Sequence, residues 1–174
     1  TRSAAILVKD DSKSGSSGGA MSEFSDMGIF RSNTNINNEL FTLKSPALMT
    51  EVVRRLRLNE TYTVRKGLKN VDLYKANPVA VTFGEVMEKP VSFTIRIDSK
   101  DAFTISGLKV AGVESENTFA GRMGDSIQTA AGTLFISPTK FYSDACIGTS
   151  IRYAIGKADA AADRYLHALR VELG

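Results

Sequence analysis

The chain has 174 residues, of which 43% are hydrophobic and 24% charged, as in a single core-forming domain and unlike a disordered segment. Its net charge of +3 is too small to indicate a nucleic-acid-binding protein. A single cysteine, Cys146, excludes an internal disulfide and a zinc site built from several cysteines. A single histidine, His167, excludes a histidine-rich metal centre. We therefore expect neither a metal site nor a cofactor.

The two ends of the sequence are abrupt. The chain begins at Thr1 beside an apolar run, and residues 3–8 predict a strand. Residues 12–20, which contain only Ser, Gly, Lys and Ala, predict a flexible loop. The last residues are still patterned as apolar and predict the start of a further strand at 169–173. We therefore interpret residues 1–174 as one domain cut from a longer protein.

Residues 35–58 form the clearest helical region. Ile36, Leu40 and Leu43 recur at the spacing of one helix face. Ser45 followed by Pro46 predicts an N-cap and the first turn of a second helix, so we expect a helix, a kink and another helix. The second apolar face is expected to comprise Leu48, Val52 and Leu56, with Met49 and Val53 beside it.

After Asn59 the apolar period becomes two, which is typical of strands. A turn at residues 98–101 is expected to join two of the strands as a hairpin. Residues 121–125 predict another turn, and residues 159–168 predict a helix. Strand-like segments are predicted at residues 61–65, 71–74, 79–83, 91–97, 102–107, 110–119, 133–136 and 150–155. The sequence thus predicts an α+β fold, with helices packed on a mostly antiparallel sheet.

The segment between Arg54 and Lys75 is locally basic. Such a segment is either an ordinary solvated face or a surface that contacts anionic lipid head groups or an anionic polymer. Nucleic acid is disfavoured, because Tyr62 and Tyr74 are the only aromatic residues there that could stack on bases. The candidate surface residues are Arg54, Arg55, Arg57, Arg65, Lys66 and Lys69.

Other polar residues give weaker indications of chemistry. Asp98 and Asp101 could form a carboxylate pair of the kind that glycoside hydrolysis uses, although aspartates also favour turns. Cys146 has no neighbouring histidine and predicts a buried, unreactive thiol. His167 predicts a surface or helix-capping residue. We assign no catalytic residue, and we expect that this chain is not itself an enzyme.

Residues 36–58 resemble the N-terminal signature of the chain-length-determinant (Wzz) family. In that family a similar block follows the first periplasmic strand. Shorter segments at 132–134, 151–162 and 169–171 resemble later parts of the family pattern. Residues 9–11 and 71–74 look most like the versions found in capsular-polysaccharide proteins of Bacteroidetes. The matching residues of the main block are Ile36, Asn38, Glu39, Leu40, Leu43, Ser45, Leu48, Val52, Val53, Leu56 and Leu58.

This resemblance implies a periplasmic domain held at the inner membrane by helices outside the chain. Family members are polysaccharide co-polymerases that oligomerise and regulate the chain length or export of capsule, exopolysaccharide or O-antigen. The expected partners are further copies of the chain and the polymerase or export machinery. Some members carry a cytoplasmic tyrosine kinase. The family's long helical hairpin is missing here. The resemblance assigns Ile36, Leu40, Leu43 and Val52 to the core and Ser45 to the cap.

Two other functions remain open at this point. The chain could be a free periplasmic or secreted carbohydrate-binding module, which would need no membrane helices. It could also be a carbohydrate-acting enzyme that uses a carboxylate pair such as Asp98 and Asp101.

Overall fold

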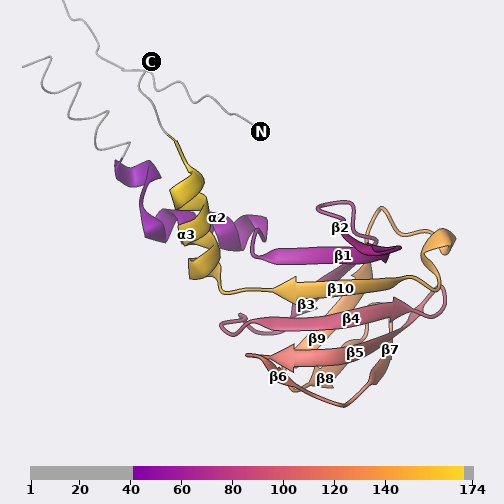
Figure 1. Ribbon diagram of the computed structural model, residues 1–174. Coiled ribbons are helices and arrows are strands. Elements are labelled where there is room, and N and C mark those ends of the chain that lie inside the picture. Colours follow the sequence, from indigo (N-terminus) through magenta and orange to yellow (C-terminus); the bar gives the residue numbers. More distant parts are fainter. Residues whose placement is uncertain (1–40, 171–174) are drawn as a thin grey trace, which may run out of the picture.

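The computed structural model describes residues 41–170 (Figure 1). The predicted strand at residues 3–8, the predicted loop at 12–20 and the residues Ile36 and Leu40 lie outside this range, as does most of the strand predicted at 169–173.

Two antiparallel sheets make up most of the described chain. The larger sheet has the order β2 (Lys69–Asp72), β1 (Glu60–Lys66), β10 (Ser150–Ile155), β4 (Val91–Ile97), β5 (Ala102–Val110) and β6 (Val113–Glu114), with β7 (Phe119–Arg122) also paired to β5. The smaller sheet has the order β3 (Val79–Phe83), β9 (Gly132–Pro138) and β8 (Ser126–Thr129). The remaining elements are α2 (Pro46–Leu56), a single 3-10 turn at Asp144–Cys146, and α3 (Ala158–Ala168).

One hydrophobic core lies between the two sheets, which face each other as a sandwich (Figure 1). Alternate residues of β4 point inward, so that Phe93 and Ile95 are buried while Ser92 and Thr94 are half-buried on the other face. Val81 of β3 supplies part of the opposite side. The strands predicted at 79–83, 91–97 and 150–155 are confirmed with the same boundaries.

A β-bulge at Gly107 changes the expected end of β5. The sequence predicted that this strand stops at Gly107, but it continues to Val110. Gly107 has φ +61°, and the register between β4 and β5 shifts between Ser92 and Thr94. The extra residue changes which positions face inward, so Leu108 is buried after Ile105.

The two helices pack against each other at one end of the sandwich (Figure 1). Their contact is a separate small cluster in which Val53 of α2 meets Ala161 and Ala162 of α3. The α+β fold and the break between two helical segments near Ser45 are confirmed. Within this fold, the helices bury their apolar residues against each other at the end of the sandwich.

The predicted apolar face of α2 is also corrected. Leu48 and Leu56 are exposed and Val52 is half-buried, whereas Val53 is fully buried. Pro46 occupies the first turn as predicted, but the Ser45 side chain forms no capping hydrogen bond. The contact with α3 therefore determines which face of α2 is buried, and this is not the most hydrophobic face of α2.

Two weaker predictions around β7 are wrong. The strand expected at 110–119 is broken up: Val110 ends β5, Val113–Glu114 form β6, and Phe119 begins β7. Gly121, expected in a turn, lies within β7. A Cβ atom at Gly121 would clash with the Ile127 side chain and lie 3.1 Å from Cζ of Phe103, so this glycine permits close packing.

Candidate functional site

The connections between the helices and the larger sheet meet at one place, which we call the neck (residues 57–59 and 156–157). β1 and β10 are antiparallel neighbours, and Glu60 lies opposite Ile155 at the end nearest the helices. The backbone N–H of Gly156 donates to the carbonyl of Asn59 at 2.9 Å. The Asn59 side chain in turn donates to the carbonyl of Gly156 at 2.7 Å. The chain's entry to and exit from the sandwich are thus tied together.

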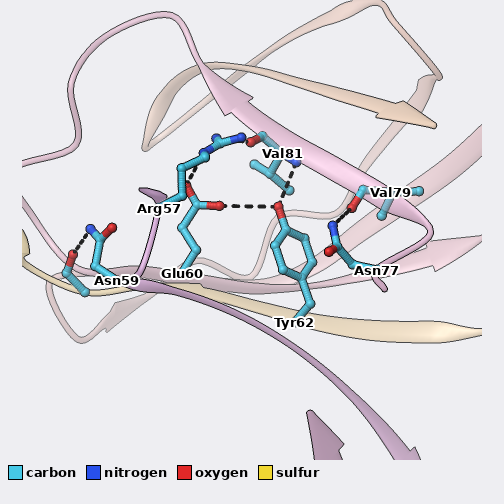
Figure 2. Close-up of polar contacts among 8 residues, drawn as sticks. Arg57, Asn59, Glu60, Tyr62, Asn77, Val79 and Val81 are labelled. Carbon is cyan, nitrogen blue, oxygen red and sulfur yellow. Dashed lines mark hydrogen bonds and ion pairs between the residues drawn. The ribbon is translucent and has the colours of Figure 1, made fainter. Parts of the chain in front are cut away.

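Arg57 ends α2 in a conformation that favours glycine. Its backbone has φ 53° and ψ 42°, in the left-handed region. A non-glycine residue there costs about 1 kcal/mol or more, so its side chain has to compensate through other contacts. Its guanidinium donates to Glu60 Oε1 at 2.7 Å and to the carbonyl of Val81 at 2.5 Å (Figure 2).

Tyr62 extends these contacts across the sandwich. The backbone N–H of Val81, in the smaller sheet, donates to the Tyr62 hydroxyl at 3.0 Å. That hydroxyl lies 3.5 Å from Glu60 Oε2, to which it donates. Figure 2 shows Arg57 and Tyr62 both reaching Val81, with Glu60 between them. These four residues, which we call the neck network, join α2, the larger sheet and the smaller sheet.

Burial dominates the electrostatics of the neck network. Only 8% of the Glu60 side chain is exposed. Burial raises the pKa of Glu60 above its usual value, and the charge and hydrogen bond of Arg57 offset this only in part. Burial likewise raises the pKa of Tyr62 to about 12, although the hydrogen bond from Val81 lowers it. Tyr62 therefore stays protonated at neutral pH and keeps its O–H as a donor.

The raised pKa of Glu60 predicts a pH-dependent stability. The folded state holds the Glu60 proton more tightly than the unfolded state, so this group's contribution is greatest below pH 4.5 and is lost as pH rises through the folded pKa. We expect the free energy of unfolding of the native protein, relative to Glu60→Gln, to fall between pH 4 and pH 7. Urea unfolding of both proteins at the two pH values measures this. A relative stability that rises with pH would mean that the ion pair with Arg57 outweighs burial.

Two clefts flank the neck. The larger, of about 520 Å³, mixes cations with carboxylates and has Val86 and Met87 in its wall. The smaller, of about 370 Å³, is lined partly by Asn59, Thr61 and Arg164. The charged residues of the larger cleft are Arg54, Arg57, Lys157, Glu60, Glu88 and Asp159. Because these charges are mixed and Glu60 already pairs with Arg57, the neck has the features of a structural joint between helices and sandwich.

The six basic residues predicted as one surface fall into two groups. Arg54, Arg55 and Arg57 lie at the C-terminal end of α2, where Arg55 pairs with Glu51 at 2.7 Å. Arg65, Lys66 and Lys69 lie at the β1–β2 hairpin, at the opposite end of β1 (Figure 1). The seven residues of β1 separate the groups by about 20 Å. The structure therefore places the six residues in two separate groups, with β1 between them.

The carboxylates considered for catalysis lie in the turn between β4 and β5, as the turn prediction required. Asp98 accepts a hydrogen bond from the Thr104 hydroxyl at 2.6 Å and lies 3.4 Å from Arg96. Asp101 accepts from Ser99 at 3.3 Å and lies 3.8 Å from Arg122. These contacts are those of an exposed turn that joins two strands.

Cys146 and His167 lie apart from the neck. Cys146 is half-buried against the core, with its Sγ 3.8 Å from the Ser143 hydroxyl, so its predicted burial is only partial. His167 is exposed in the last turn of α3, as predicted. Within residues 41–170, no three His, Cys, Asp or Glu residues are grouped as metal ligands. In the same range, no helix is long and apolar enough to cross a membrane.

The sequence analysis missed the role of Glu60. The signal was available, because Glu60, Tyr62 and Val64 share one face of a strand by the period of two. A carboxylate at an inward position requires a partner, and Arg57 precedes it by three residues. The contact with Val81 could not be found, since it depends on how the two sheets pack.

Comparison with models of known protein families gives no match, and no curated protein matches the sequence.

Proposed function

We propose that the chain is the periplasmic domain of an inner-membrane polysaccharide co-polymerase, which regulates the chain length or export of a capsular polysaccharide, exopolysaccharide or O-antigen. The proposal rests on the resemblance of residues 36–58 to the chain-length-determinant family. Its expected partners are further copies of the same chain and the polymerase or export machinery.

The observation that best supports this proposal is the pairing of α2 with α3. These helices lie about 100 residues apart in the sequence, yet Val53 packs on Ala161 and Ala162. They therefore bring both ends of the described chain to the same end of the sandwich (Figure 1). A domain anchored in one membrane by segments on both sides requires this arrangement.

The neck network suits the same role. Arg57 and Tyr62 connect the helical base to both sheets, so the sandwich would be held in a defined orientation over its base. A regulator of polymer length works by presenting surfaces to identical neighbours and to a polymerase. For that work a fixed orientation matters more than a reaction centre.

The open reading frame on both sides of the chain tests the membrane part of the proposal. We expect an apolar span of about 20 residues shortly before Thr1 and a second span after Gly174, the latter preceded by a long helical segment. A cleavable leader upstream and a stop codon near Gly174 would contradict the proposal. That result would favour a free carbohydrate-binding module.

A further inference from the structure

The β1–β2 hairpin and the turn after it, residues 65–75, form a second surface, which we call the hairpin surface. Its turn, Gly67–Leu68, lies at the end of the larger sheet away from the helices (Figure 1), and residues 69–75 run back along β1 as far as Tyr62. Four exposed cations against one carboxylate, Asp72, leave it with a charge of +3, equal to that of the whole chain. The cations are Arg65, Lys66, Lys69 and Lys75.

The hairpin surface gathers four cations without ion pairs in one short segment, whereas several other cations of the sandwich pair with carboxylates. Arg96, Lys109 and Arg122 each have a carboxylate partner within 4 Å. Among residues 41–170, none of the four hairpin cations forms an ion pair, and the Arg65 guanidinium donates only to the carbonyl of Gly67 at 3.2 Å. The carboxylates at the same end of the sandwich, Asp98 and Asp101, are already paired. The positive charge of the hairpin surface is thus left for an external partner.

The apex of the hairpin carries an exposed leucine, and an exposed tyrosine, Tyr74, follows the other end of β2. Leu68 follows Gly67 in the two-residue turn between the strands, and 95% of it is exposed. Tyr74 is 79% exposed, and its backbone has φ 48°. The Asp72 carboxylate accepts a hydrogen bond from the Tyr74 N–H at 2.7 Å, which holds the tyrosine in this unfavourable conformation. The fold therefore maintains an exposed leucine and an exposed tyrosine among unpaired cations.

We propose that the hairpin surface docks onto an anionic lipid surface, with Leu68 entering the headgroup layer. A convex apex with a leucine at its tip can enter a deformable bilayer, whereas small-molecule ligands bind in concave sites. Tyrosine is favoured at the level of the headgroups, and lysine and arginine are attracted by anionic lipids. This proposal rests only on residues 65–75. Because the hairpin turn points away from the helical end that the proposed function places at the inner membrane, the lipid surface it contacts is not that anchoring membrane.

Vesicle binding of the purified chain tests this docking. We expect co-sedimentation with vesicles of equal parts phosphatidylglycerol and phosphatidylcholine at 0.1 M salt, and none with phosphatidylcholine alone. Reversing two cations, Lys66→Glu with Lys69→Glu, is expected to weaken binding about 30-fold or more. The matched control, Lys89→Glu with Arg164→Glu, changes the net charge equally at the neck end. It should change binding less than about threefold, because that end lies beyond the screening length of about 10 Å.

Insertion of the apex has its own test. The chain contains no tryptophan, so Leu68→Trp introduces a single fluorophore at the tip. Its emission should shift to shorter wavelength on phosphatidylglycerol vesicles and stay unchanged on phosphatidylcholine. Three results would each overturn the proposal: an unshifted emission, equal loss of binding in the two charge-reversed proteins, or binding to soluble heparin without binding to vesicles. The last would assign the surface to an acidic polymer.

Discussion

Replacing Tyr153 with alanine should cost about 3–5 kcal/mol of stability, whereas replacing it with phenylalanine should stabilise the protein by about 1 kcal/mol. Tyr153 is fully buried at the centre of an aromatic cluster, with ring centroids 5.0 Å from Tyr62 and 5.1 Å from Phe93. Alanine would remove these contacts and leave a cavity. The Tyr153 hydroxyl, however, is buried without a hydrogen-bond partner. Phenylalanine keeps the ring and removes this cost, which predicts a gain of about 1 kcal/mol.

Urea unfolding of the native protein and the two variants measures these differences. Both variants lack the hydroxyl, and they differ only in whether the ring is kept. The difference between the two variants therefore measures the packing of the ring, and the difference between Tyr153→Phe and the native protein measures the effect of the hydroxyl. A loss of more than about 1 kcal/mol in Tyr153→Phe would show that the hydroxyl contributes a favourable interaction.

Ala161→Glu should separate the two helices without unfolding the sandwich. Ala161 is 1% exposed and packs on Val53 in a cluster distinct from the main core. A larger, charged side chain there would cost about 3 kcal/mol or more. Helices of 11 residues are marginal on their own, so α2 and α3 should both unfold. We expect amide exchange to accelerate about 100-fold or more in residues 46–56 and 158–168, with β4 and β10 still protected.

Ala160→Glu is the matched control for this experiment. Ala160 is exposed on the same turn of α3, and a glutamate there would stand four residues before Arg164, a favourable helical pair. Its exchange should equal that of the native protein. If Ala161→Glu also removed protection from β4 and β10, the helices and the sandwich would be one cooperative unit.

Strand positions were predictable where one face is buried between the sheets. In β4, Val91, Phe93, Ile95 and Ile97 alternate strictly with polar residues, so the period alone gave the boundaries. The end of β5 was not predictable, because a glycine such as Gly107 can either end a strand or form a bulge, and the sequence does not distinguish the two.

The buried face of α2 was harder to predict from the sequence, for a different reason. Apolar residues cover more than half of this helix, from Leu48 and Met49 to Val52, Val53 and Leu56. The partner therefore decides which of them is buried. That partner is a pair of small alanines, Ala161 and Ala162, whose lack of bulk permits a close approach to Val53. Nothing local in α2 indicates a contact so distant in the sequence.

The neck network shows the same limit for the candidate site. Arg57 was predicted as one cation of a basic surface, because the local sequence contains three arginines. In the structure its charge is used within the fold, on Glu60 and on the carbonyl of Val81. By contrast, the cations of the hairpin surface are exposed and lack ion-pair partners within residues 41–170. Three-dimensional pairing, and not the number of charges, separates a structural cation from one available to a partner.

The length distribution of surface polysaccharide in the source organism tests the proposed function most directly. Gel electrophoresis of polymer from cells with the gene deleted, and from cells complemented with the native gene, would measure it. The account predicts that deletion broadens the modal length or abolishes export, and that the native gene restores it. An unchanged length distribution and an unchanged yield of surface polymer in the deletion strain would contradict it.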